Sequence, residues 1–162
     1  MRKFIIIAML LFAFCALPAK AQTVSYEFTQ FGDNTLTWIL TLDWIADGTG
    51  AVSWNTDITP LYGNKTITEA LKGTMCVRII TIPDAVTPPS ALYDIVVSEY
   101  GGDVMGGRLT DRSDTTTEFE APDVLTGTDA AFGGAILSDT WTVSVTNAGS
   151  GGTGTLILIF AR

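Results

Sequence analysis

Alternation of apolar and polar residues recurs along most of this chain. Between Leu36 and Trp44, tryptophan and leucine occupy every second position, and most positions between them hold threonine or aspartate. Between residues 139 and 147, tryptophan and valine alternate with threonine and serine in the same way. Successive side chains of a strand point to opposite faces, so both segments are predicted to be strands with one buried face and one wet face.

Other segments extend this β pattern. Residues 75–82 and 155–161 are continuous apolar runs rich in isoleucine, which predicts central strands buried on both faces. Residues 115–120 predict a polar edge strand. Residues 66–74 indicate one or two helical turns, with Thr66 or Thr68 as N-cap and Gly73 as the stop. Further strands are predicted at residues 23–31, 50–54 and 93–100.

Turn residues separate these segments. Asp47-Gly48 predicts a hairpin turn, and the glycine-rich stretch 147–152 predicts a second, C-terminal hairpin. Residues 82–91 contain three prolines and therefore form a connection rather than a central strand. The fold class predicted is all-β, an antiparallel β-sandwich of about seven to nine strands, with a partly closed β-barrel as the alternative.

The N-terminus has the three parts of a secretory signal peptide. Arg2 and Lys3 precede an apolar run from Phe4 to Leu17, and Ala19-Lys20-Ala21 matches the small-residue cleavage pattern. The apolar run is shorter than the roughly 20 residues that a membrane-spanning helix needs. We therefore expect residues 1–21 to be a signal peptide, residues 22–162 to form one domain outside the cytoplasm, and no membrane span to remain after cleavage.

Charge narrows the range of partners. Cleavage after Ala21 would leave six basic and seventeen acidic residues, a net charge of −11. Nucleic acid is therefore excluded as an expected partner, because binding a phosphate backbone needs clustered lysine and arginine. Cys15 would leave with the signal peptide, so no disulfide forms within the mature chain. Cys76 lies in an apolar strand pattern and is expected to be a small buried hydrophobic residue.

The composition lacks residues that most catalytic mechanisms require. The chain contains no histidine, which excludes imidazole-based hydrolases and histidine-ligated metal sites. Glu118 and Glu120 share one face of a predicted strand and could form a glycosidase pair, but the solvated face of an edge strand is the favoured interpretation. Asp57 and Glu69 have no assigned role. No catalytic residue, cofactor or metal is predicted.

The segment 93–114 is the densest cluster of candidate site residues. Asp103, Asp111 and Asp114 lie among glycines and could supply oxygen ligands to calcium, but Arg108 and Arg112 would neutralise these acids without a metal. Asp111 and Arg112 are expected to form an ion pair. Turn architecture is favoured over a binding site, because glycine allows positive φ and aspartate bonds to nearby backbone amides.

Four tryptophans raise the alternative of sugar stacking. Trp38, Trp44 and Trp141 lie on the apolar face of their strands and are expected in the core. Trp54, beside the polar residues 55–57, is the remaining candidate for an exposed stacking surface.

The C-terminal part of the chain, about residues 75–162, carries an ordered set of features. They are a strand, a proline-bearing loop, Tyr93-Asp94-Ile95, the turn at Gly101–Asp103, Gly106-Gly107, Asp111-Arg112-Ser113, Asn147-Ala148-Gly149, Gly152 and Gly154. In these features the chain resembles small β-rich proteins encoded among the structural genes of tailed phages and prophages. The resemblance implies a non-enzymatic virion component, such as a head-decoration or accessory surface subunit. It carries no catalytic residues to transfer, and the signal peptide instead favours a secreted or cell-surface relative.

These observations predict a structural or interaction protein that assembles with itself or decorates a larger scaffold. A carbohydrate-binding or adhesive module of the cell exterior is the first alternative. A fibre-forming or pilus-like subunit, in which a terminal strand completes a neighbour's sheet, is the second.

Overall fold

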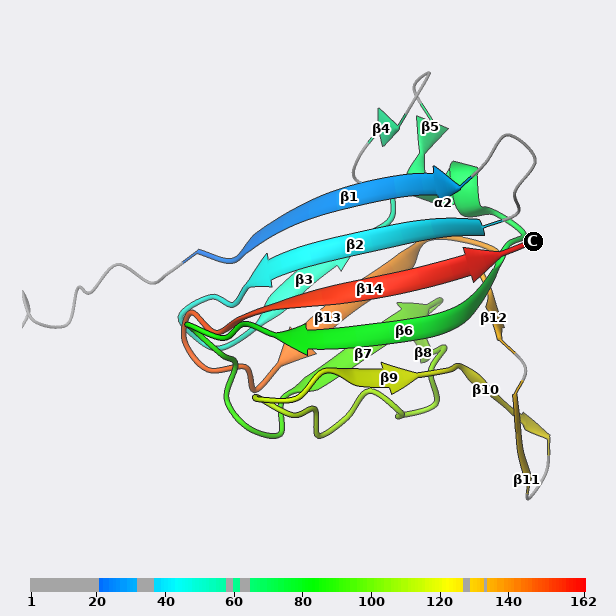
Figure 1. Cartoon of the computed structure of the whole chain (residues 1–162). Helices are drawn as coiled ribbons and strands as arrows, with labels where there is room; N and C mark the ends of the chain where they lie inside the picture. The colour runs from blue at the N-terminus through cyan, green and yellow to red at the C-terminus, as the bar shows by residue number, and fades with distance from the viewer. Residues whose placement is uncertain (1–20, 32–36, 58–59, 62–64, 127–128, 133) are drawn as a thin grey trace, which may run out of the picture.

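The computed structural model describes residues 21–31, 37–57, 60–61, 65–126, 129–132 and 134–162. These residues form two antiparallel sheets packed face to face, and the sheets do not close into a barrel (Figure 1). The predicted β-sandwich is thus confirmed. Apart from Ala21, the predicted signal peptide lies outside the described residues.

One layer is a six-stranded sheet with the order β1-β2-β14-β6-β12, in which β9 also pairs with β6. The last strand along the chain, β14, lies in its centre, between β2 and β6 (Figure 1). The strands of this sheet are β1 (Thr23–Phe31), β2 (Thr37–Ile45), β6 (Met75–Pro83), β9 (Glu118–Glu120), β12 (Ala135–Ile136) and β14 (Thr153–Ala161).

The second layer is a four-stranded sheet with the order β3-β13-β7-β8. Two short two-stranded ladders, β4-β5 and β10-β11, lie outside both layers. The two-residue strands are too short for a sequence pattern to predict, whereas β9 lies within the predicted edge strand 115–120. The elements outside the first sheet are β3 (Val52–Asn55), β4 (Pro60–Leu61), β5 (Lys65–Thr66), α2 (Ile67–Leu71), β7 (Asp94–Glu99), β8 (Gly102–Asp103), β10 (Asp123–Thr126), β11 (Asp129–Phe132) and β13 (Trp141–Thr146).

The core lies between the two sheets and follows the alternation in the sequence. Every second residue of β2 is buried from Trp38 to Trp44, and β13 buries Trp141 and both of its valines. Trp44 packs against Tyr93 with ring centroids 5.8 Å apart. Leu36, predicted to belong to the same buried set, lies outside the described residues.

The two predicted hairpins are wrong. The turn after β2 leads to β3, and the loop after β13 leads to β14, and each connection passes from one sheet to the other. The loops lie against each other, since a Cβ on Gly50 would stand 2.6 Å from the nitrogen of Gly149. The glycines permit this close approach of two crossing loops, a role that the local sequence cannot distinguish from a tight hairpin.

The prediction that 75–82 and 155–161 are buried on both faces is also wrong. In β14, buried and half-buried residues alternate strictly, so only the inner face is fully covered. The outer face nevertheless carries isoleucine.

The single described helix, α2, follows the predicted signals. Thr66 is the N-cap and forms a capping box with Glu69, in which each side chain accepts from the other residue's backbone N–H. The chain leaves the helix at Lys72 and Gly73, where φ is +78°. Glu69, which had no assigned role, therefore stabilises a helix end.

Candidate functional site

Arg112, itself buried, is the centre of an ion cluster with two half-buried glutamates. Its side chain comes from the loop after β8, and the residue is only 7% exposed. Nη1 lies 3.1 Å from Glu120 and Nε lies 3.6 Å from Glu118, while Nε also donates to the carbonyl of Thr110. The predicted partner was Asp111, and that pairing is wrong, because the arginine turns toward β9 instead.

Strand register explains why the two glutamates turn inward. Glu118 faces Thr81 and Glu120 faces Ile79 across the β9-β6 ladder, and both of these β6 residues are buried. Facing residues of a ladder share a face, so both carboxylates lie on the inner side and Phe119 points outward. The interpretation of these acids as the solvated face of an edge strand is therefore wrong.

This cluster clamps a loop rather than forming an acid–base pair. Glycoside hydrolysis requires two carboxyl groups on either side of the substrate bond. Here both carboxylates are bound to the same guanidinium, and Glu118 also accepts the backbone N–H of Ser113 at 2.7 Å. The arrangement ties the loop that contains Arg112 to the edge of the six-stranded sheet.

The three candidate ligands Asp103, Asp111 and Asp114 do not gather around a common point. In the part of the chain that the structure describes, no three acidic or cysteine side chains lie close enough to share a metal ion. Asp103 accepts the backbone N–H groups of Met105 and Gly107 and so organises its own turn. Asp111 has a positive φ of 53°, and its N–H donates to Asp94. These contacts are turn architecture, as predicted for this segment.

Two other candidates are buried. Trp54 is only 7% exposed and packs beside Tyr26, with ring centroids 6.2 Å apart. The expectation of an exposed stacking surface at Trp54 is therefore wrong, because alternate residues of β3 face the core. Cys76 is buried as predicted, and burial raises the pKa of its thiol to about 12, which keeps it protonated and unreactive.

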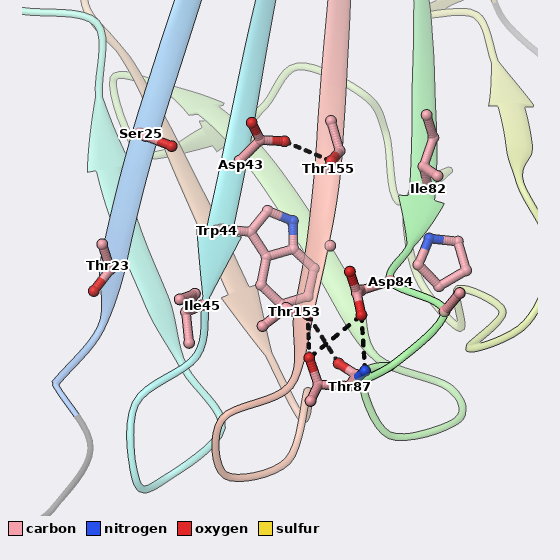
Figure 2. Close-up of a pocket in the computed structure, with 13 residues that line it drawn as sticks. Thr23, Ser25, Asp43, Trp44, Ile45, Ile82, Asp84, Thr87, Thr153 and Thr155 are labelled. Atoms are coloured by element: carbon pink, nitrogen blue, oxygen red, sulfur yellow. Dashed lines mark hydrogen bonds between the residues drawn. The ribbon is translucent and has the colours of Figure 1, made fainter.

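A shallow concavity of about 530 Å³ lies at one end of the outer face of the six-stranded sheet (Figure 2). We call it the threonine concavity, because hydroxyl and carboxylate side chains line much of it. The polar lining comprises Thr23, Ser25, Asp43, Asp84, Thr87, Thr153 and Thr155.

Both carboxylates of the threonine concavity are held by the protein itself. Asp43 accepts the hydroxyl of Thr155 at 2.6 Å. Asp84 accepts the backbone N–H groups of Thr87 and Val86, and these bonds hold the pKa of its carboxyl below the usual value. No basic side chain belongs to the described lining. The concavity therefore suits neutral hydroxylated groups or cations rather than anions.

The outer face of the same sheet also bears an apolar patch that the sequence analysis missed. We call it the isoleucine face. Direct cross-strand pairs connect it, namely Ile39 with Ile159, Ile157 with Ile80, and Ile80 with Phe119. Phe119 is 61% exposed, and the isoleucines are half-buried. Its six members are Ile39, Ile80, Ile82, Ile157, Ile159 and Phe119.

A signal for this patch was present in the sequence. Ile157 and Ile159 lie between the buried residues of β14, whereas three of the five outward positions of β2 hold threonine or aspartate. The continuous apolar run predicts burial on both faces, but no third layer covers this part of the described structure.

Comparison with known proteins gives no relative: no family model, no curated protein and no solved structure matches this chain. The resemblance to phage-encoded β proteins thus stays a prediction. None of the described helices is long and apolar enough to cross a membrane.

Proposed function

We propose that this protein is a non-enzymatic structural subunit, held outside the cytoplasm or on a virion surface by contact with a larger scaffold. The observation that supports this proposal is the isoleucine face. Outward positions of a sheet in a two-layer sandwich are usually polar, whereas six neighbouring ones here are apolar. A contiguous exposed apolar patch with polar surroundings is typical of a protein interaction site.

The charges around the patch favour a basic partner. Glu27 lies across Thr41 from Ile157, and Asp43 lies across Thr155 from Ile82. Arg78 is an exposed cation beside Ile159, but the chain as a whole has seventeen acidic against nine basic residues. The matching scaffold surface would be flat and apolar at its centre, with lysine or arginine at its rim.

The candidate catalytic residues support the same proposal. Glu118 and Glu120 bind a buried arginine, and Cys76 is a buried, protonated thiol. The resemblance favours the virion form of this role, and the predicted signal peptide favours the cell-surface form.

Native electrophoresis of protein extracted from its source tests the proposal. The unaltered protein should migrate in a complex much larger than the chain, and Ile157→Lys should migrate as the released subunit. Ser25→Lys is the matched control, because Ser25 is on the same outer face but lies on the edge strand β1, outside the isoleucine face. Ile157→Thr provides a milder variant, and circular dichroism would confirm folding. Migration of the unaltered protein as a free subunit would contradict the proposal.

Carbohydrate binding remains a second candidate, now at the threonine concavity rather than at Trp54. Its hydroxyls and carboxylates can exchange hydrogen bonds with sugar hydroxyls, and Ile45, 41% exposed, adds an apolar contact. Binding on a glycan array that disappears in Thr155→Val but persists in Thr146→Val, an exposed site on the other sheet, would favour this candidate. An array without signal would count against it.

A further inference from the structure

We infer that β1 is a dimerisation edge that pairs, antiparallel and fully overlapped, with β1 of a second copy of this chain. The inference extends the proposed function to a second surface and rests on it only for the use of the dimer in an assembly. Its basis is that the described structure covers or shortens three of the four sheet edges and leaves β1 (Figure 1).

Two of the other edges are very short. The four-stranded sheet ends at β8, which has two residues and leads directly into the turn organised by Asp103. The far edge of the six-stranded sheet is divided between β12, with two residues, and β9, with three. The acids of β9 are held by Arg112. Short and charged edge strands are common ways to prevent unwanted pairing.

The third edge, that of β3, is capped by a side chain. Thr56 donates its N–H to the carbonyl of Trp141 at 3.0 Å, so even-numbered residues of β3 bond to β13 and Ser53 turns outward. The amide of Gln22 donates to the Ser53 carbonyl at 3.1 Å and accepts its N–H at 2.8 Å. Gln22 therefore satisfies the outward groups of Ser53 as the peptide of a neighbouring strand would.

The same reasoning identifies the unpaired groups of β1. Ala46 donates to the carbonyl of Gly152 at 2.8 Å, so even-numbered residues of β2 bond to β14 and odd-numbered ones bond to β1. In β1, which pairs with β2 without a bulge, the odd-numbered residues then bond inward. Backbone groups of Val24, Tyr26, Phe28 and Gln30 therefore point away from the sheet, and no described residue bonds to them.

The composition of β1 does not protect this edge. The strand is nine residues long and contains no proline or lysine, and Glu27 is its only charged residue. The inner side chains Val24, Tyr26 and Phe28 pack against the core but are only half-buried. Long edges of this kind are templates for another strand.

A second copy fits this edge by symmetry. An antiparallel ladder contains twofold axes, so a strand edge is complementary to itself in an isologous dimer. Full overlap pairs the four outward-pointing residues with one another and keeps the core faces on one side. Tyr26 then faces Phe28 of the copy, a favourable aromatic cross-strand pair, and Glu27 faces its own counterpart.

This geometry also limits the assembly to two copies. A fibre would need a second usable edge on each subunit, and the described edges other than β1 are short or capped. The ladder covers less area than a standard protein interface, so we expect a dissociation constant on the order of 10 μM.

Sedimentation of the purified protein over about 1 to 300 μM, a range that brackets weak interfaces, tests the dimer. The weight-average mass should rise toward twice that of the chain. Gln30→Pro removes an outward donor at a position where an edge strand tolerates proline, and it should weaken the dimer at least about tenfold. Gln30→Ala keeps the donor and should stay within about twofold of the unaltered protein.

Cysteine cross-linking tests the register, in a background in which serine replaces Cys15 and Cys76 stays buried. Facing residues at the Glu27 pair would have Cα atoms about 4.5 Å apart, which suits a disulfide. Glu27→Cys should form covalent dimers on mild oxidation. Ser25→Cys, on the same face of β1, would face Thr29 of the copy and should not.

A protein that stays monomeric throughout, or equal cross-linking of the two cysteine variants, would overturn the inference. These outcomes are separable from a failure of the proposed function. If the purified protein dimerises but no larger complex is found in extracts, the β1 dimer is supported and scaffold binding is refuted. If a larger complex is found in extracts but the purified protein stays monomeric, only the β1 dimer is refuted.

Discussion

The two edges of the six-stranded sheet are built in opposite ways. At the β9 edge, a buried arginine and two glutamates hold a three-residue strand against β6. At the β1 edge, a nine-residue strand carries one charge, and its outer backbone groups have no bonding partner among the described residues. The same sheet therefore uses desolvated charge to close one side and keeps the other side available.

The difference indicates which edge of the sheet can pair with another strand. Desolvating an ion cluster is costly, and such clusters often add less stability than apolar packing would. The cluster at β9 instead specifies which loop covers the edge. Among the described residues, no comparable feature protects β1, which favours pairing there.

The largest expected effect comes from breaking the β9 clamp. Arg112→Met would leave two half-buried carboxylates without their cation, and we expect a loss of about 3 kcal/mol in the free energy of unfolding. Urea denaturation measures this change, and hydrogen exchange should show faster exchange in β9. Arg78→Met, at an exposed site of the same sheet, should change stability by less than about 0.5 kcal/mol. Equal effects of the two substitutions would refute the clamp.

Removing the side-chain cap of β3 would make a covered edge resemble β1. Gln22→Ala deletes both hydrogen bonds to Ser53, and we expect a loss of about 1 kcal/mol, because both bonds are exposed to water. With a second edge uncovered, sedimentation at high concentration should show species larger than a dimer. Gln22→Glu keeps the acceptor but not the donor, so its stability should lie between that of the unaltered protein and that of Gln22→Ala.

The charge of Glu27, at the centre of β1, should affect the affinity of the dimer. In the fully overlapped dimer, Glu27 faces its own counterpart, so Glu27→Gln removes a like-charge contact worth about 0.5 kcal/mol. This energy corresponds to about a two- to threefold rise in dimer affinity. Added salt should raise the dimer affinity of the unaltered protein in the same way, because it screens the repulsion between the two glutamates. An unchanged affinity in sedimentation would argue against this register.

Acid should weaken the loops at the ends of the sandwich. The Thr49 hydroxyl and the Ala51 N–H hold the pKa of Asp47 below its usual value, and the Thr87 and Val86 N–H groups do so for Asp84. Because the folded state binds these protons less readily than the unfolded chain, stability is present above about pH 4 and falls below it.

Thermal unfolding between about pH 2 and pH 6 measures this loss, since the window brackets an ordinary aspartate pKa. In Asp84→Asn, the melting temperature should decrease less on acidification than in the unaltered protein. A melting temperature that rises on acidification would contradict a stabilising role of the ionised aspartates.

Several features of the fold were readable from local sequence. The buried set of β2, the capping box at Thr66 and Glu69, the burial of Cys76 and the turn role of Asp103 all depend on neighbours within a few residues. Trp54 was misjudged because the polar residues that follow it suggested exposure, although its position in β3 decided its burial. The partner of Arg112 was misjudged because proximity in sequence favoured Asp111.

The sequence by itself determined where the long strands lie, which side chains of β2 and β13 face the core and how acidic the chain is. These properties follow from side-chain alternation and composition. Only the tertiary structure decided that the turns after β2 and β13 cross between sheets, that Gln22 caps β3 and that β1 is left at an edge. Each of these depends on which distant strands pair, and pairing is set by the packing of the whole sandwich rather than by any one segment.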